Sequence, residues 1–98
     1  MSLIPWKKKD ALVIPKDQVI IYSRMGCKYC AKAKRIFKEH NLSYEDRSVN
    51  LPVHSRELIA LMKERGVPKS KITVPQVWFW GEYIGGEEDV ERYFKKEG

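Results

Sequence analysis

Two cysteines three positions apart are the residues in this sequence whose type and spacing could do chemistry. Cys27 and Cys30 lie in the stretch GCKYC, and the chain has no other cysteine. A Cys-x-x-Cys pair is found in three kinds of site: a metal clip, a structural disulfide, and a pair of thiols that cycles between reduced and oxidised forms. These three possibilities make different demands on the rest of the sequence.

A metal site would need further ligands, and the sequence offers few. A structural zinc site is closed by a full set of protein ligands. Only His40 and His54 remain as additional soft ligands, and the thirteen residues between them do not match the short histidine spacing of zinc fingers. We therefore expect no metal here and assign both histidines to the surface or to packing, while the pair alone leaves the metal interpretation open.

The residues on either side of the cysteines predict that a strand meets a helix at this point. The apolar run QVIIYS at residues 18–23 predicts a buried strand, and residues 28–40 repeat apolar side chains at helical spacing. Free backbone N–H groups and the helix dipole stabilise a thiolate at the start of a helix. We predict that Cys27 is an exposed nucleophile of low pKa and that Cys30 is buried and less ionised, the asymmetry that dithiol exchange needs.

The remaining elements predict a small α/β domain. Further strands are expected at residues 43–50 and, as a hairpin, at 76–86, and further helices at 55–66 and 87–98. In this order the first two strands should be parallel and the last two antiparallel. We divide the chain into an N-terminal extension at residues 1–17, whose ALVIP stretch could add a strand, and a domain at residues 18–98.

Composition limits the classes of protein to which the chain could belong. With 98 residues, 43% hydrophobic and 33% charged, it is of the size and kind of a single soluble domain. No apolar run is long enough to cross a bilayer and no signal peptide is visible, so we expect a cytoplasmic protein with no membrane partner. The net charge of +6 includes thirteen acids, and we interpret the basic run at residues 7–9 as solvated surface, not a nucleic-acid site.

A second group of residues, at positions 72–90, could bind a ligand. Pro75 precedes an apolar strand, where it could be an ordinary strand start or form a cis bond that exposes the backbone of Val74 to an extended thiol peptide. The glycines at 85–86 permit close approach of a ligand to the backbone. The acids at 87–89 suit a helix N-terminus and could also hold a ligand ammonium group.

Together these two motifs resemble those of the glutaredoxin family. The stretch GCKYC is similar to the family's Cys-Pro-Tyr-Cys site, and TVPQVWFWGEYIGGEED is similar to its Thr-Val-Pro segment followed by a Gly-Gly-x-Asp-Asp turn. The resemblance covers residues 18–95. It implies a thioredoxin-like α/β fold, in which a central four-stranded mixed sheet is flanked by about three helices. It also implies a monomeric thiol–disulfide oxidoreductase with no tightly bound cofactor and with glutathione as co-substrate.

The resemblance also implies a role for particular residues. Cys27 would attack protein disulfides or glutathione mixed disulfides, and Cys30 would resolve the protein mixed disulfide. The residues that would bind glutathione are Arg24 at a carboxylate, Tyr29 beside the sulfurs, Thr73 and Val74 at the cysteinyl backbone, Pro75 as the cis-proline, Gly86 in the turn, and Glu88 and Asp89 at the γ-glutamyl end.

The sequence departs from the family pattern at two positions. Lys28 stands where the family usually has proline, and we hypothesise that it lowers the pKa of Cys27 relative to a proline variant. Glu88 replaces the first aspartate of the turn. Two alternatives remain: electrons could come from a flavoprotein reductase, or the protein could bridge an iron–sulfur cluster between two protomers with Cys27 and glutathione as ligands.

Overall fold

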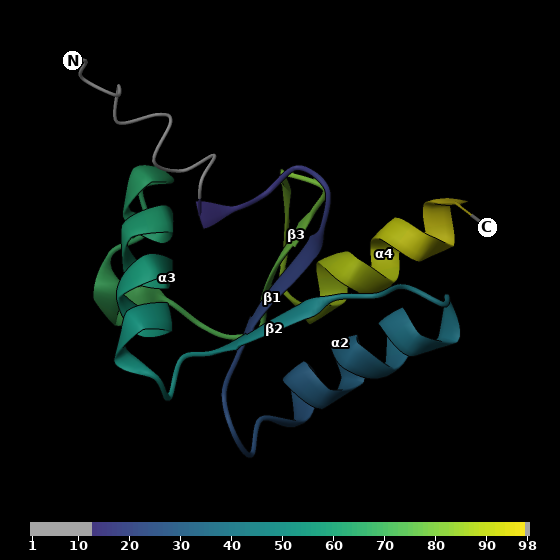
Figure 1. The fold of residues 1–98 in the computed structure, drawn as a ribbon, viewed down its shortest axis with the longest axis horizontal. Helices are drawn as coiled ribbons and strands as arrows, with labels where there is room; N and C mark the ends of the chain where they lie inside the picture. Colours follow the sequence, from purple (N-terminus) through teal and green to yellow (C-terminus); the bar gives the residue numbers. More distant parts are fainter. Residues whose placement is uncertain (1–12, 98) are drawn as a thin grey trace.

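A mixed sheet of four strands forms the centre of the fold (Figure 1). The computed structural model describes residues 13–97. The strands are β1 (Val19–Ser23), β2 (Glu45–Ser48), β3 (Gln76–Phe79) and β4 (Glu82–Gly85), in the order β2-β1-β3-β4. The pair β1 and β2 is parallel, while β1 and β3, and β3 and β4, are antiparallel. The predicted directions of the first and last strand pairs are therefore confirmed.

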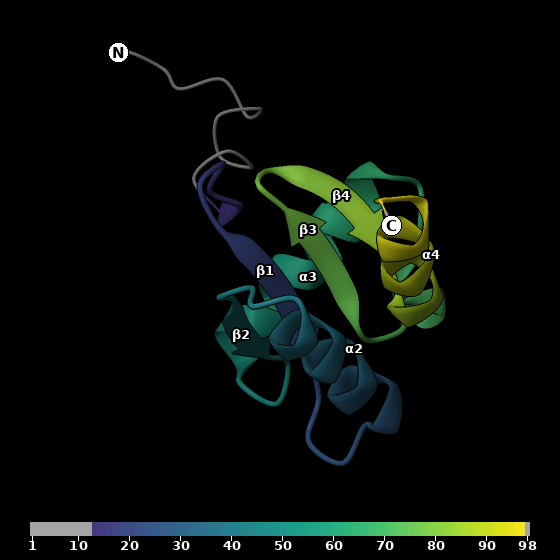
Figure 2. The ribbon, with the colours of Figure 1, turned by 90° about the vertical axis from the view of Figure 1, so that its right-hand side faces the viewer.

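Helices cover both faces of this sheet. Figures 1 and 2 show α2 (Lys28–Glu39) and α4 (Glu87–Glu97) on one face and α3 (Pro52–Glu64) on the other. A short 3-10 turn, η1 (Lys69–Lys71), leads from α3 towards β3. The predicted α/β thioredoxin-like architecture, with a four-stranded mixed sheet and three flanking helices, is confirmed.

The alternation of side chains along the central strand divides the core into two layers. All five residues of β1 are buried, because helices cover both sides of this strand. Ile20 and Tyr22 pack towards α3, whereas Val19 and Ile21 pack towards α2 and α4, as the two-residue period of a strand requires. The packing of α2 against this layer therefore holds the start of the helix near the end of β1, where the cysteines lie.

The structure corrects two predicted boundaries. Helix α3 begins at Pro52 and not at residue 55, because proline fits the first helical position, where a backbone N–H would have no helical partner. Strand β2 is shorter than the predicted 43–50 segment. The β3–β4 hairpin turns through Trp80 and Gly81, both at positive φ (49° and 88°), which is the conformation of a type I′ turn.

A buried arginine links β2 to the segment that precedes β1. Arg47 is 8% exposed and donates hydrogen bonds to the Val13 carbonyl (2.6 Å), the Tyr22 hydroxyl (2.8 Å) and Glu45 (2.7 Å). Burial raises the pKa of the Tyr22 hydroxyl, which in turn donates to Glu57 on α3. These bonds attach the start of the described chain to the sheet.

The predicted N-terminal extension lies largely outside the described residues. Of the ALVIP stretch, Val13, Ile14 and Pro15 are described and form no strand, and Ile14 is buried in the α3-side core. Within residues 13–97, no helix has the length and apolar character that a membrane span requires.

Candidate active site

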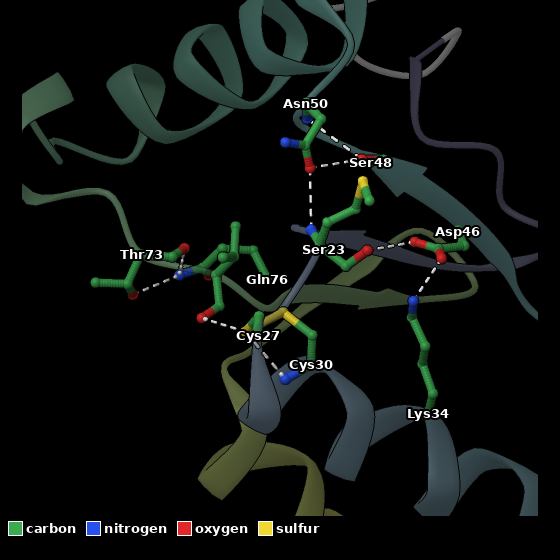
Figure 3. Close-up of a disulfide and its surroundings, with 11 residues drawn as sticks. Ser23, Cys27, Cys30, Lys34, Asp46, Ser48, Asn50, Thr73 and Gln76 are labelled. Carbon is green, nitrogen blue, oxygen red and sulfur yellow. Dashed lines mark hydrogen bonds and ion pairs between the residues drawn. A yellow bond between two sulfur atoms is a disulfide. The ribbon is translucent and has the colours of Figure 1, made fainter.

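Cys27 and Cys30 form a disulfide where β1 leads into α2 (Figure 3). Their Cα atoms are 5.2 Å apart, within the usual range for a disulfide. Cys27 is the N-cap of α2, and its Sγ accepts a hydrogen bond from the backbone N–H of Cys30 at 3.2 Å. Cys27 is partly exposed, whereas Cys30 is 1% exposed. The predicted position at a helix start and the unequal burial of the two sulfurs are both confirmed.

The side chains beside Cys27 are cationic. Helix α2 has no acidic residue in its first turn, and both Arg24 and Lys28 are exposed. The ammonium of Lys28 lies 5.4 Å from the ring centroid of Tyr29, a cation–π distance. Positive charges and an oriented N–H favour the thiolate that Cys27 would carry after reduction. The particular influence of Lys28 on Cys27 stays a prediction.

The backbone of the segment that leads into β3 faces the sulfur of Cys27. The Val74–Pro75 peptide bond is cis, as predicted, and the Val74 carbonyl oxygen is 3.8 Å from Cys27 Sγ. Gln76, which is 6% exposed, donates from Nε2 to the Thr73 carbonyl at 3.0 Å (Figure 3). Gln76 was not predicted from the sequence. The one signal that could have indicated it was a polar side chain in an otherwise apolar strand. The amide of Gln76 holds the turn that carries the predicted ligand-pairing backbone.

A pocket next to the cysteines brings the second motif together with the first. Its volume of about 480 Å³ falls within the range of small-molecule sites. All eight residues predicted to bind glutathione line it: Arg24, Tyr29, Thr73, Val74, Pro75, Gly86, Glu88 and Asp89. Ile72 and Glu87 complete the lining. The fold thus places segments that are far apart in the sequence around one cavity, and the role of each residue in binding remains a prediction.

The acidic residues at the start of α4 differ in the partners of their side chains. Asp89 accepts a hydrogen bond from the backbone N–H of Gly86 (2.9 Å) and pairs with Arg92 (2.9 Å). The side chain of Glu88 is exposed, and its carboxylate makes no hydrogen bond or ion pair with another side chain or backbone group of the 13–97 segment. Gly85 has a φ of 126°, and a Cβ there would overlap the Asp89 carboxylate, so the turn needs glycine at this position. Of this pair of acids, Glu88 is the one left for a ligand.

The third acid of the turn faces the cysteine helix instead. The Glu87 side chain is 4% exposed, and its carboxylate lies 3.5 Å from the ammonium of Lys32 on α2, which also contacts Glu91 at 3.0 Å. Burial, and then the nearby Glu91 carboxyl, raise the pKa of Glu87. Hydrogen bonds from Glu87 and Lys32 lower the pKa of Glu91. The sequence grouped Glu87 with its neighbours because it could not show which way each side chain points.

A network of polar side chains fixes the loop that precedes Cys27. The Met25 N–H donates to Asn50 Oδ1 at 2.9 Å, which ties this loop to the turn before α3. Asp46 of β2 accepts hydrogen bonds from the Ser23 hydroxyl and the Lys34 ammonium, each at 2.5 Å (Figure 3). None of these contacts was predicted, because each joins residues more than ten positions apart.

The two histidines occupy packing positions. The ring of His40 stacks on Phe94 with centroids 4.0 Å apart, and His54 Nδ1 lies 3.1 Å from the Ser48 carbonyl oxygen. Over residues 13–97, no group of three or more His, Cys, Asp or Glu side chains is arranged to hold a metal ion. The ring stacking of His40 and the contact of His54 with Ser48 agree with the assignment of the histidines to packing.

Comparison with known proteins places the chain in a family. The glutaredoxin family model matches residues 19–84. Glutaredoxin 1 of Rickettsia prowazekii is 35% identical over 82 residues, which cover 82% of this chain and 79% of the relative. A hybrid peroxiredoxin of Haemophilus influenzae is 33% identical over 92% of this chain but only 38% of its own length, and human mitochondrial glutaredoxin-2 is 33% identical over 85% and 49%. The chain therefore spans about half or less of the length of several curated relatives.

Solved structures agree with this placement. Glutaredoxin 1 of Francisella tularensis has a TM-score of 0.65 and 30% identity, covering 81% of this chain and 93% of that one. The holo form of glutaredoxin C1 from Populus tremula x tremuloides has a TM-score of 0.73 and 27% identity, covering 92% and 85%. With the family match, the shared fold and the Cys27–Cys30 pair at the start of α2, this chain belongs to the glutaredoxin family of thiol–disulfide oxidoreductases.

Proposed function

We propose that the protein reduces protein disulfides and glutathione mixed disulfides, with glutathione as the electron source and no tightly bound cofactor. The observation that carries this proposal is the pocket beside Cys27, lined by exposed Arg24, the Val74 backbone and the unpaired Glu88. Glutathione carries two carboxylates, one ammonium and an extended cysteinyl backbone. The pocket offers a group of matching chemistry to one carboxylate, to the ammonium and to the cysteinyl backbone.

In the proposed binding mode, the cysteinyl backbone, one carboxylate and the ammonium of glutathione each meet one group of the pocket. The cysteinyl backbone pairs with Val74, whose carbonyl already lies 3.8 Å from Cys27 Sγ, so that the two sulfurs meet. A carboxylate pairs with Arg24. The γ-glutamyl ammonium pairs with Glu88, since Asp89 is already bonded to Gly86 and Arg92.

Reduction of a protein disulfide then proceeds in two exchanges. The Cys27 thiolate attacks one substrate sulfur and forms a mixed disulfide, while the other substrate sulfur leaves as a thiolate that takes up a proton. Cys30 loses its proton and attacks Cys27 Sγ, which releases the second substrate thiolate and forms the Cys27–Cys30 disulfide. Two glutathione molecules supply the two electrons that restore the dithiol and leave as glutathione disulfide.

A glutathione mixed disulfide requires Cys27 alone. Its thiolate attacks the glutathione sulfur and frees the substrate thiol. A second glutathione thiolate then attacks the glutathione sulfur of the mixed disulfide on Cys27, which forms glutathione disulfide and releases the Cys27 thiolate. Cys30 takes no part in this cycle.

The decisive experiment is a coupled assay that compares two electron donors. The oxidised protein is supplied with glutathione and glutathione reductase, or with a flavoprotein thioredoxin reductase, and turnover of a glutathione mixed disulfide is followed. We expect turnover only with glutathione, and Arg24→Gln should raise the KM for glutathione about 10-fold, the loss expected for one charge-assisted hydrogen bond. Turnover with the flavoprotein alone would contradict the proposal.

The hybrid peroxiredoxin among the relatives suggests one protein substrate to include. The match to the Haemophilus protein covers 92% of the present chain, and that protein is named a hybrid peroxiredoxin. We propose that an oxidised peroxiredoxin is a disulfide substrate of the present chain. Peroxide consumption by a peroxiredoxin that depends on this protein and on glutathione would support that assignment, and no consumption above the peroxiredoxin alone would remove it.

A further inference from the structure

Three exposed apolar side chains occupy segments on a different side of the disulfide from the pocket. Met25 is 79% exposed, Leu51 53% and Val53 50%, and we refer to them together as the Met25 patch. Met25 lines a second hollow with Cys27 and Cys30, and only Arg24 is shared between this hollow and the proposed glutathione pocket. Figure 3 shows Asn50, which precedes Leu51, on a different side of the disulfide from Thr73 of the pocket.

Hydrogen bonds hold the backbone of the patch in place. Asn50 Oδ1 accepts from the Met25 N–H (2.9 Å) and from the Ser48 hydroxyl (3.1 Å). The Leu51 N–H donates to the Ser48 carbonyl at 3.1 Å. The apolar side chains are therefore presented on a fixed backbone, and their exposure is not that of a loosely held loop.

Helix α3 begins without the stabilisation of a polar N-cap side chain, because Leu51 occupies this position. Leu51 is the N-cap of α3 and makes no side-chain hydrogen bond to the helix. Serine, threonine, aspartate or asparagine are preferred at this position, because their side chains satisfy free N–H groups. Asn50 lies one residue away, but its side chain is bonded to Met25. An exposed leucine at a cap position contributes little to the folded monomer, which points to a contact outside it.

The charges beside the patch indicate the chemistry of that contact. Arg24 and Lys28 flank Met25 and Cys27 in sequence, and both are exposed. In the described part of the chain neither side chain pairs with a carboxylate. Lys34, the other cation lining the second hollow, is bound to Asp46. The free charge around the patch is therefore positive, and it complements an acidic partner.

We propose that the Met25 patch docks protein disulfide substrates in which the reacting cysteine is flanked by an apolar residue and by aspartate or glutamate. This inference rests on the proposed reduction of protein disulfides. The apolar side chain packs against Met25 and Leu51, and the carboxylates lie near Arg24 and Lys28. A small glutathione adduct fits the pocket and has no need of the patch, so the two kinds of substrate separate.

The test uses two synthetic peptides, each closed by one intramolecular disulfide. One carries leucine and glutamate beside its cysteines, and the other carries serine and lysine at the same positions. We expect the wild-type protein to reduce the first with a kcat/KM at least about 10-fold higher. Equal kcat/KM values for the two peptides would overturn the proposal.

A matched pair of variants assigns the effect to the patch. Leu51→Asn removes the apolar side chain and supplies a preferred N-cap, so it should raise Tm by about 3 °C. It should lower kcat/KM for the leucine–glutamate peptide about 10-fold and leave turnover of a glutathione mixed disulfide unchanged. Trp80→Asn also removes an exposed apolar side chain (48% exposed), at the β3–β4 turn, where it creates the Asn-Gly pair that a type I′ turn favours. Trp80→Asn should leave both activities unchanged.

The outcomes separate the docking proposal from the proposed function. If the wild-type protein reduces both peptides equally, or if Leu51→Asn changes neither, the patch is not the docking surface although protein disulfides are substrates. If neither peptide is reduced while the glutathione adduct is, the proposed protein-disulfide activity itself fails. If Leu51→Asn slows both kinds of substrate alike, the effect is on the cysteines and the docking proposal is wrong.

Discussion

The two sides of the active site differ in how far apart in the sequence their parts lie. The cysteine turn (residues 24–30) is contiguous, and its reactive sulfur accepts a hydrogen bond from its own helix, through the Cys30 N–H at 3.2 Å, while the pocket wall adds only the Val74 carbonyl at 3.8 Å. The pocket wall (residues 72–75 and 86–89) joins two segments that meet only because β3 and β4 form a hairpin. Its shape depends on Gln76, Gly85 and the Asp89 carboxylate.

This difference separates chemistry from selection. A change at the Cys27 sulfur should affect every substrate, because every proposed reaction passes through Cys27. A change at the acidic turn of the pocket wall should affect only the steps in which glutathione or a glutathione adduct binds, because the cations and the N–H that favour the thiolate belong to the cysteine turn.

Replacing the nucleophile should have the largest effect. Cys27→Ser removes the one cysteine of the described chain that is not buried and should lower turnover of both glutathione adducts and protein disulfides by at least about 10³-fold. The measurement is steady-state turnover with each substrate class, beside an unchanged Tm as a control for folding. Substantial remaining turnover of either class would show that Cys27 is not the common nucleophile.

Replacing the buried cysteine should divide the two substrate classes. Cys30→Ser leaves Cys27 at the helix start but removes the thiol that resolves a protein mixed disulfide. We expect turnover of glutathione adducts within about 3-fold of the wild type and a loss of at least about 10²-fold for protein disulfides. Mass spectrometry should find the protein substrate trapped on Cys27, and equal losses for both classes would contradict the division of roles.

A change in the pocket wall should affect glutathione and spare the sulfur. In Gly85→Ala, the new Cβ would overlap the Asp89 carboxylate, and the φ of 126° is one that alanine rarely adopts. Displacing Asp89 removes its bond to the Gly86 N–H, so we expect the KM for glutathione substrates to rise about 10-fold. The rate at which iodoacetamide alkylates reduced Cys27 should stay the same.

Gly66→Ala is the matched control for this variant. Gly66 also has a positive φ, of 82°, but a Cβ there meets no atom within 4 Å. Both substitutions therefore carry backbone strain, and only Gly85→Ala moves a residue of the pocket wall. A similar rise in KM for both variants would assign the effect to lost stability, and slower alkylation in Gly85→Ala would show that the two sides of the site are coupled.

The sequence predicted what depends on local order and missed what depends on side-chain direction. The N-cap position of Cys27 followed from a strand-to-helix change within a few residues, and the cis bond at Pro75 followed from the resemblance of a short motif. The hydrogen bonds of Asn50 to Met25 and of Asp46 to Lys34 depend on how β2 lies beside β1, which no short stretch of sequence encodes. Local pattern therefore predicted the cysteine pair and the residues that line the pocket, but not the side chains that hold them.

The acids of the wall give the clearest case. Three consecutive carboxylates look alike in the sequence, yet Glu87 turns to Lys32 of the cysteine helix, Glu88 to solvent, and Asp89 to the Gly86 N–H. Their directions are set by the phase at which α4 packs against α2. The Lys32–Glu87 contact also joins the cysteine helix to the pocket wall, so it can be used to measure how independent these two sides of the site are.

The smallest predicted effect concerns this contact and its dependence on pH. Burial and the Glu91 carboxyl raise the pKa of Glu87, so the folded protein holds this proton more tightly than the unfolded chain does. Stability from this group is therefore present at low pH and is lost as pH rises from the ordinary value of 4.5 through the raised one. The lowered pKa of Glu91 acts in the opposite sense, because its stabilisation is lost as pH falls below 4.5.

Glu87→Gln removes the first of these dependences. The Tm of the variant relative to the wild type should rise by a few degrees between pH 4.5 and neutrality, because the variant has no carboxylate to ionise at this buried site. Glu88→Gln removes the same charge from the exposed neighbour and controls for net charge. If the Tm difference for Glu87→Gln falls over this interval, the favourable pairing with Lys32 outweighs burial. If the KM for glutathione instead becomes independent of pH in Glu87→Gln alone, ionisation at the α2–α4 contact reaches the pocket, and the two sides of the site act together.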